Sequence, residues 1–215
     1  MPVADFFLRT PHRGSTMELR AGSQGAAMPR ESYPWWFNYF FDNPLRRLFQ
    51  RPEDILGPWV EPGMRALDAG CGMGFLAIPM ARLVGEGGAV VAVDVRPRVL
   101  AVLRRRAERA GVERRITTHC GPTEELNIGG PFDFGLAFWS LHTMDDPAQV
   151  ARRLAAHLEP GAPLLIAEPL GHVHRRRFEA LAFTVLNSGF EIAELPEVPL
   201  SHAALLRRAA PCTAD

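Results

Sequence analysis

Short apolar runs alternate with longer amphipathic stretches from about residue 64 to the end of the chain. Five runs predict strands, at 65–68, 89–94, 115–120, 132–139 and 162–168. The second of them, AVVAVD, is apolar up to its last residue, as buried parallel strands are. Helical segments are predicted at 74–84, 98–111, 146–158 and 173–188, and a closing hairpin at 190–209. This alternation predicts an α/β fold, with a mostly parallel seven-stranded sheet, a C-terminal antiparallel hairpin and helices on both faces.

The first 60 residues have a different pattern. Residues 1–30 are rich in Gly, Pro, Ser and Ala without a sustained period, which predicts a mobile N-terminal arm. Residues 31–60 hold seven aromatic side chains between Tyr33 and Phe41. We expect a helical segment there that either packs on the sheet or forms a lid over a ligand. Residues 61–210 then form the main domain.

Composition narrows the function classes. The 24 basic residues are all arginine and are balanced by 24 acidic residues, so no overall field attracts nucleic acid or an acidic membrane. The absence of lysine excludes a lysine Schiff base. The three cysteines show no metal or disulfide spacing, which favours no metal site and a reducing, cytoplasmic location. The apolar runs are shorter than the ~20 residues of a membrane span.

A glycine-rich turn follows the first predicted strand. In LDAGCGMG, at 67–74, the residues Gly70, Gly72 and Gly74 stand two apart, and Asp94 ends the next strand 20 residues later. Glycines let a ligand approach the backbone, and an acid at this strand end can accept hydrogen bonds from ribose hydroxyls. The pair indicates a nucleoside-containing cofactor. The third glycine comes one place too early for the dinucleotide pattern G-x-G-x-x-G, which disfavours NAD and FAD.

LDAGCGMG, AVDV and LEPGAPLLIAEP together resemble the class I S-adenosylmethionine-dependent methyltransferases, whose loop is D/E-x-G-x-G-x-G. The resemblance runs from about Val60 to Arg208 and implies a Rossmann-like fold with S-adenosylmethionine as cofactor. It implies that these residues bind the cofactor: Asp68, Gly70, Cys71, Gly72, Gly74, Asp94, Val95, Pro122 and Thr123. Many members carry an acid where this chain has Gly121 and Pro122, so Glu124 or a main-chain group would contact the adenine amine instead.

Methyl transfer from a sulfonium needs an aligned acceptor and, for some acceptors, a general base. His142 and Glu168, near the ends of the fourth and fifth strands, are the catalytic candidates. The alternatives are a structural wall histidine and a glutamate that caps a neighbouring helix. The expected acceptor pocket is lined by Trp35, Trp36, Tyr39, Trp139 and His172. Of Phe138 and Trp139, one is expected in the core and the other in the pocket.

We therefore predict an S-adenosylmethionine-dependent methyltransferase that acts on a small molecule by in-line displacement. An apolar or aromatic acceptor suits the expected walls, with O, N, S or C as the acceptor atom. The alternatives are a protein methyltransferase, a cofactor-binding protein without turnover and, last, a nicotinamide oxidoreductase. No basic stripe with interleaved aromatics suggests a nucleic acid partner, and the oligomeric state is not predicted.

Overall fold

The computed structural model describes residues 46–125 and 128–210. Contacts divide the chain into residues 1–34 and 35–215, and every described residue belongs to the second unit. The expected arm at 1–30, residues 31–45 of the aromatic segment and the pocket candidates Trp35, Trp36 and Tyr39 lie outside the described residues.

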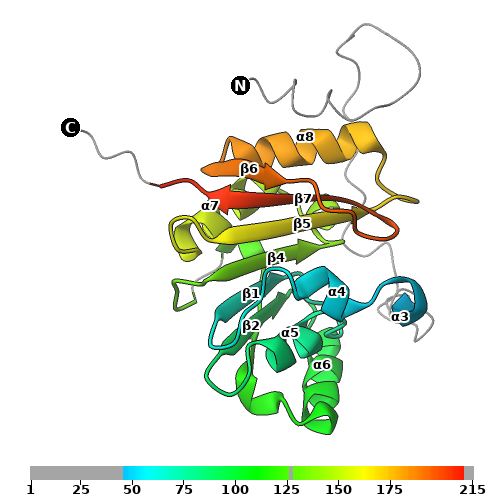
Figure 1. Cartoon of the computed structure of the whole chain (residues 1–215), viewed down its shortest axis with the longest axis vertical. Helices are drawn as coiled ribbons and strands as arrows, with labels where there is room; N and C mark the ends of the chain where they lie inside the picture. The colour runs from blue at the N-terminus through cyan, green and yellow to red at the C-terminus, as the bar shows by residue number, and fades with distance from the viewer. Residues whose placement is uncertain (1–45, 126–127, 211–215) are drawn as a thin grey trace, which may run out of the picture. The chain divides into compact units, whose positions relative to one another are not determined.

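Seven strands form one sheet in the order β3-β2-β1-β4-β5-β7-β6 (Figure 1). Their bounds are β1 Arg65–Ala69, β2 Ala89–Asp94, β3 Ile116–Cys120, β4 Phe134–Phe138, β5 Pro163–Pro169, β6 Phe190–Glu194 and β7 Ser201–Arg208. β1 to β5 are parallel to one another, whereas β7 is antiparallel to both β5 and β6. The predicted mixed sheet with a C-terminal hairpin is confirmed.

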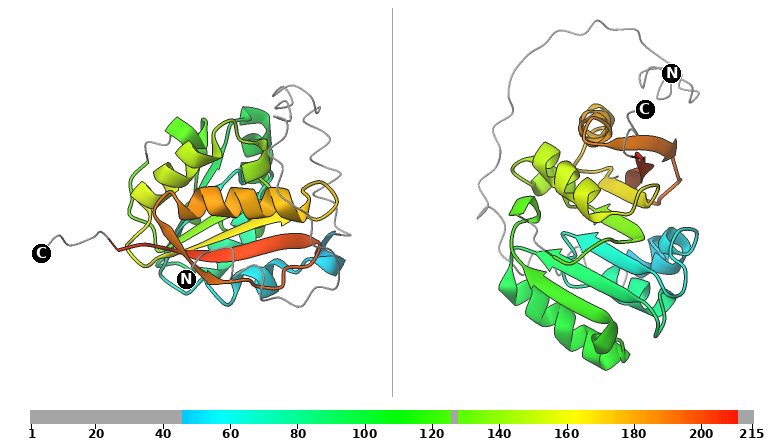
Figure 2. Two further views of the ribbon diagram at one scale, coloured as in Figure 1. Left: turned by 90° about the horizontal axis from the view of Figure 1, so that it is seen from above. Right: turned by 90° about the vertical axis from the view of Figure 1, so that its left-hand side faces the viewer.

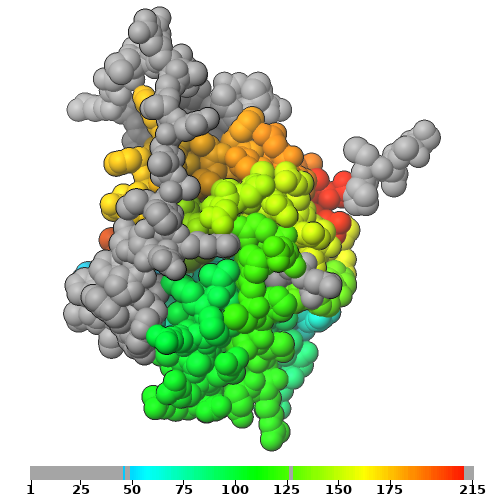
Figure 3. Space-filling model, turned by 180° about the vertical axis from the view of Figure 1, so that it is seen from behind, coloured from blue at the N-terminus to red at the C-terminus, as the bar shows by residue number. Residues whose placement is uncertain are grey.

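Helices cover both faces of this sheet. They are α3 Arg46–Phe49, α4 Pro52–Leu56, α5 Ala77–Leu83, α6 Pro97–Ala110, α7 Pro147–His157 and α8 Arg175–Leu186. α4 and α5 pack together on one face, and α7 and α8 pack together on the other (Figures 1 and 2). The space-filling view from behind shows the second of these faces (Figure 3). Among the described residues, no helix is long and apolar enough to cross a membrane.

Local sequence explains most helix ends. Asp146 caps α7 by accepting a hydrogen bond from the backbone N–H of Gln149 at 2.9 Å, as expected of an aspartate before a helix. Gly111 ends α6 in the left-handed conformation, with a φ of 67°. α5 begins at Ala77 rather than at the predicted position 74. Residues 70–76 are used by the glycine turn before the helix can start.

The sheet places the functional candidates along one edge. β1 pairs with β2 on one side and β4 on the other, so the strand order reverses between β1 and β4. Ligands of such sheets bind at the carboxyl ends of the strands next to this reversal. The residues that end β1, β2, β4 and β5 therefore border the candidate site, and Ser201, opposite Pro169, brings the start of β7 to the same edge.

Candidate functional site

The three glycines of the turn all have positive φ, but they serve different purposes. A Cβ on Gly70 would lie 2.4 Å from Cβ of Ser140, and one on Gly74 would lie 3.0 Å from Leu103. Both glycines therefore let neighbouring segments pack closely. A Cβ on Gly72 would meet nothing within 4 Å. Of the three glycines, only Gly72 presents its backbone to open space, where a ligand can approach.

Asp68 and Asp94 end adjacent strands beside this turn, and both side chains are buried, at 3% and 4% exposure. Within the described part of the chain, no residue donates a hydrogen bond to the Asp68 carboxyl. Burial, together with the nearby charge of Asp94, raises the pKa of Asp68 to about 7. Two buried carboxyl groups side by side favour a cationic ligand, because a positive charge would stabilise the ionised form of both.

Asp94 is already fully hydrogen-bonded. One carboxylate oxygen accepts from the backbone N–H of Arg96 at 3.0 Å and from its Nε at 2.9 Å. The other accepts from Nη2 of Arg96 at 2.9 Å and from the backbone N–H of Gly72 at 3.2 Å. The predicted ribose acceptor is thus paired with an arginine two positions along the chain.

Cys71 lies in the same turn, where its thiol is buried and its backbone N–H donates to Val93 O at 2.9 Å. Burial and the charges of Asp68 and Asp94 raise the pKa of the thiol well above its usual value. A thiol that resists ionisation is a poor nucleophile, so this position fills the loop.

The adenine candidates follow β2 and β3. Val95, directly after Asp94, is 46% exposed and offers an apolar surface at the strand end. Thr123 is buried, and Pro122 stands next to it with its side chain partly covered. The Oε1 atom of Glu124 is buried without a hydrogen-bond partner among the described residues. An unpaired buried carboxylate oxygen requires a donor, which the predicted contact to an adenine amine would supply.

The structure brings His142 and Glu168 into direct contact. Glu168 is completely buried at the end of β5 and accepts a hydrogen bond from the backbone N–H of His142 at 3.0 Å. Its other oxygen contacts Nδ1 of the His142 ring. The ring of His172 lies edge-on to that of His142, with centroids 5.2 Å apart. Glu168 therefore orients the imidazole and, through the His142 N–H, also caps the short 3-10 helix η3 at Leu141–Thr143.

The carboxylate determines which ring nitrogen of His142 is basic. An ionised carboxylate only accepts hydrogen bonds, so Nδ1 carries the proton and Nε2 carries the lone pair. A carboxylate that orients a histidine in this way also stabilises the imidazolium formed when Nε2 takes up a proton.

Phe138 is buried in the core, whereas Trp139 is partly exposed and packs against the same core. Trp139 has a φ of 56°, a strained conformation for a bulky residue. Its indole N–H donates to Ser201 Oγ at 2.9 Å, which fixes the ring at the sheet edge. The guanidinium of Arg46 lies 3.9 Å from the centroid of this ring and 3.9 Å from that of Phe75.

A buried glutamine, Gln50, connects Arg46 and Ser201, which both contact Trp139. Gln50 has no exposed surface, its Nε2 donates to Pro199 O and to Ser201 Oγ, and its Oε1 accepts from Arg46 Nε at 2.6 Å. The segment before β1 is therefore tied to the connection that leads into β7. Sequence analysis missed Arg46, Gln50 and Arg96. Only Arg96 left a local signal, since it follows the predicted ribose acid by two positions.

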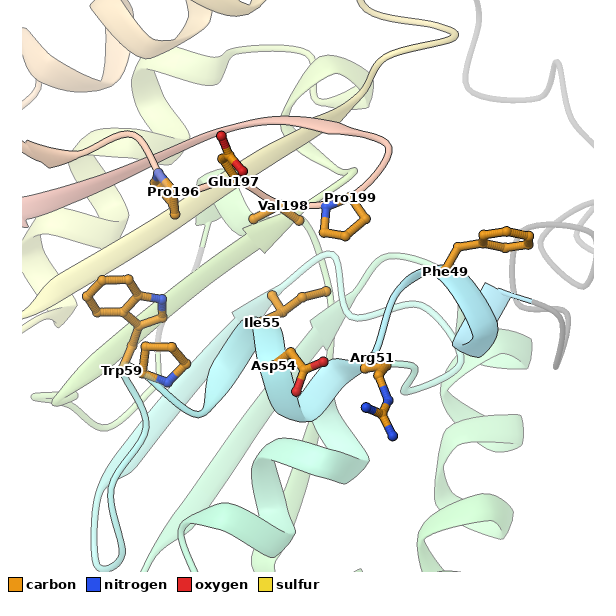
Figure 4. Close-up of a pocket in the computed structure, with 10 residues that line it drawn as sticks. Phe49, Arg51, Asp54, Ile55, Trp59, Pro196, Glu197, Val198 and Pro199 are labelled. Carbon is orange, nitrogen blue, oxygen red and sulfur yellow. The ribbon is translucent and has the colours of Figure 1, made fainter.

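A pocket of about 330 Å³ lies on the outer side of the same segment (Figure 4). Its lining comes from α3, from α4 with the residues on either side of it, and from the β6–β7 connection: Phe49, Arg51, Asp54, Ile55, Pro58, Trp59, Pro196, Glu197, Val198 and Pro199. None of these belongs to the glycine turn or to the predicted acceptor pocket. We assign it no part in the candidate site.

Comparison with known proteins places this geometry in a family. Residues 66–161 match the family described as methyltransferase domain. The ubiquinone biosynthesis O-methyltransferase of Methylocella silvestris is 35% identical over 147 residues, which cover 67% of this chain and 53% of that protein. The chain spans about half the length of such curated relatives.

Two solved structures show the same fold. An S-adenosylmethionine-dependent methyltransferase from Aquifex aeolicus aligns with a TM-score of 0.72 at 20% identity, over 83% of this chain and 100% of that one. The (4+2) cyclase SpnF aligns with a TM-score of 0.63 at 20% identity, over 74% of this chain and 80% of that one. These two structures confirm the predicted Rossmann-like fold. The domain match and the O-methyltransferase relatives confirm the predicted class I methyltransferase family, whose cofactor is S-adenosylmethionine.

Proposed function

We propose that this chain, which carries a class I methyltransferase domain, binds S-adenosylmethionine and methylates a hydroxyl group of a small aromatic molecule. The observation that carries the proposal is the His142–Glu168 pair at the strand edge that also bears the glycine turn. A hydroxyl acceptor must lose a proton when it is methylated, and an oriented histidine is the most common group to remove one. The O-methyltransferase relatives support the same acceptor atom.

The residues at the glycine turn fit the proposed cofactor. When bound, S-adenosylmethionine supplies a methyl group on a positively charged sulfur, open to in-line displacement. Asp68 and the backbone at Gly72 would hold its cationic methionine end, where a buried carboxyl is otherwise unpaired. Asp94 would accept the ribose hydroxyls, and Val95 would lie against the adenine. Glu124 would accept a hydrogen bond from the adenine amine, because this chain has Pro122 where many family members carry an acid.

His142 and Glu168 provide the acid–base chemistry. Nε2 of His142 removes the acceptor's hydroxyl proton, and Glu168 holds the ring in the tautomer that leaves Nε2 basic. The imidazolium then carries the proton until solvent takes it. Trp139, fixed through Ser201, and His172 form the described part of the acceptor wall.

Two free cysteines in the described part of the chain agree with a reducing, cytoplasmic location.

A cofactor-binding protein without turnover is the main rival, because a fold does not by itself establish an activity. The test has two stages. Calorimetry with S-adenosylmethionine, S-adenosylhomocysteine and NAD should show binding of the two sulfur nucleosides and none of NAD. Turnover is then measured as S-adenosylhomocysteine formed in the presence of a panel of phenols and catechols.

His142→Ala should lower turnover by about 100-fold or more while cofactor affinity is retained. Glu168→Gln, an isosteric change that removes the charge beside the imidazole, should lower kcat while cofactor affinity is retained. His174→Ala is the matched control, because His174 is exposed at the start of α8 and should leave turnover unchanged. Cofactor binding without turnover on any acceptor supports the rival. Full activity of His142→Ala would show that catalysis here is positioning alone.

A further inference from the structure

The carboxylate of Asp94 has no capacity left for a ligand. A carboxylate has about four lone-pair sites. In Asp94 both side-chain oxygens accept two hydrogen bonds each, from Gly72 and from three nitrogens of Arg96. Neighbouring ribose hydroxyls would need both of these oxygens at once. Some of the present donors must therefore leave before a ribose can bind.

The donors differ in how easily they can leave. The N–H groups of Gly72 and Arg96 belong to the backbone of the glycine turn and of the residue before α6, so the fold holds them in place. The Arg96 side chain is 43% exposed, whereas that of Asp94 is 3% exposed. Its Nε and Nη2 bonds form a bidentate pair that can open into solvent without disturbing the core. The guanidinium is thus the group that moves.

We propose that Arg96 is an internal competitor for the ribose subsite, which closes on Asp94 in the free protein and is displaced when the cofactor binds. This inference rests on the proposed function, because it assumes that Asp94 receives the ribose. The side chain would lower cofactor affinity by the free energy needed to open the bidentate pair. Removing the Arg96 side chain should therefore tighten cofactor binding, whereas the loss of a residue that borders a site ordinarily weakens it.

The test measures S-adenosylhomocysteine binding by calorimetry to the wild type, Arg96→Ala and Arg98→Ala. Arg98 is the matched control, because it lies two residues further on, is exposed and makes no hydrogen bond or ion pair with the described residues. We expect Arg96→Ala to bind S-adenosylhomocysteine about 5-fold tighter or more. In this variant the ligand no longer has to displace the partly exposed guanidinium from its bidentate pair with Asp94. Arg98→Ala should stay within about twofold of the wild type, since it changes the same charge without touching Asp94.

A ligand pair tests whether the effect belongs to the ribose hydroxyls. Adenosine and 2′,3′-dideoxyadenosine are compared as competitors of S-adenosylhomocysteine. The gain from Arg96→Ala should appear with adenosine and be lost with the dideoxy compound, which cannot use Asp94. Arg96→Lys keeps the charge without the planar fork and should give an intermediate affinity.

The possible outcomes separate this inference from the proposed function. If the wild type binds S-adenosylhomocysteine and Arg96→Ala binds equally or more weakly, the competition is refuted while cofactor binding stands. An equal gain for both nucleosides would also refute it, because the effect would then be general electrostatics. If neither protein binds the sulfur nucleosides, the proposed function fails and this inference falls with it.

Discussion

Asp68→Asn tests the electrostatics of the site most directly. The pKa of this carboxyl rises from 3.8 in the unfolded chain to about 7 in the fold. At about 1.4 kcal/mol per unit, holding the ionised group costs the folded protein about 4 kcal/mol. A raised carboxyl pKa means that the folded state binds the proton more tightly than the unfolded state. Stability is then fully present below pH 3.8 and is lost as the pH rises through about 7.

Asparagine does not titrate, so the variant escapes this loss. Between about pH 5 and pH 8, its free energy of unfolding should gain about 2–3 kcal/mol on that of the wild type. For a chain of this size the gain corresponds to about 5–10 °C in melting temperature. Urea unfolding at several pH values gives the difference between the two proteins, in which groups common to both cancel.

Asp54→Asn is the control, because Asp54 is exposed on α4 and the change removes a carboxyl group of the same type away from the buried pair. A flat difference for Asp68→Asn, or one that shrinks toward pH 8, would refute the reasoning. The same variant should bind S-adenosylmethionine about 10-fold more weakly, since it loses a carboxylate partner of the cationic end. The neutral product S-adenosylhomocysteine should lose less.

Two further changes test local geometry. Gly70→Ala should destabilise the fold by about 2–3 kcal/mol in urea unfolding, because its Cβ would clash with Ser140. Gly72→Ala should lower the free energy of unfolding by only about 1 kcal/mol, but it should bind S-adenosylhomocysteine more weakly. Unchanged affinity in Gly72→Ala would mean that no ligand approaches the turn. Asp146→Ala should lower the free energy of unfolding by about 1 kcal/mol, because α7 loses its cap. Asp146→Asn should retain most of the capping energy, so equal losses in the two variants would argue against capping.

The sequence predicted features that depend on neighbouring residues. Apolar runs located the strands, and LDAGCGMG located the turn in which all three glycines have positive φ. The strand order also brings the ends of β4 and β5 together, so His142 and Glu168 were both expected at the same edge. Their direct pairing across 26 positions was not predicted, because it depends on how the turn after β4 bends back.

Other contacts left no pattern in the sequence. Gly70 is small because Ser140 lies against it, and that closeness follows from the packing of two loops. The Gln50 hydrogen bond to Ser201 spans 151 positions. The left-handed backbone of Trp139 is unfavourable by local preference and is stabilised by its tertiary contacts. Arg96 and Asp94 are only two positions apart, but their side-chain hydrogen bonds depend on the rotamer of the arginine, which the sequence does not specify.

The Gln50 tie has a consequence for building hybrid enzymes. The proposed cofactor residues lie between Asp68 and Glu124, and the described residues of the proposed acceptor wall lie between Trp139 and Ser201, so a crossover before β4 separates these two sets. Gln50 hydrogen-bonds Pro199 and Ser201 in the second half although it precedes the first. A functional chimera therefore needs residues 46–56 and 134–208 from the same parent, with residues 65–125 as the exchangeable piece.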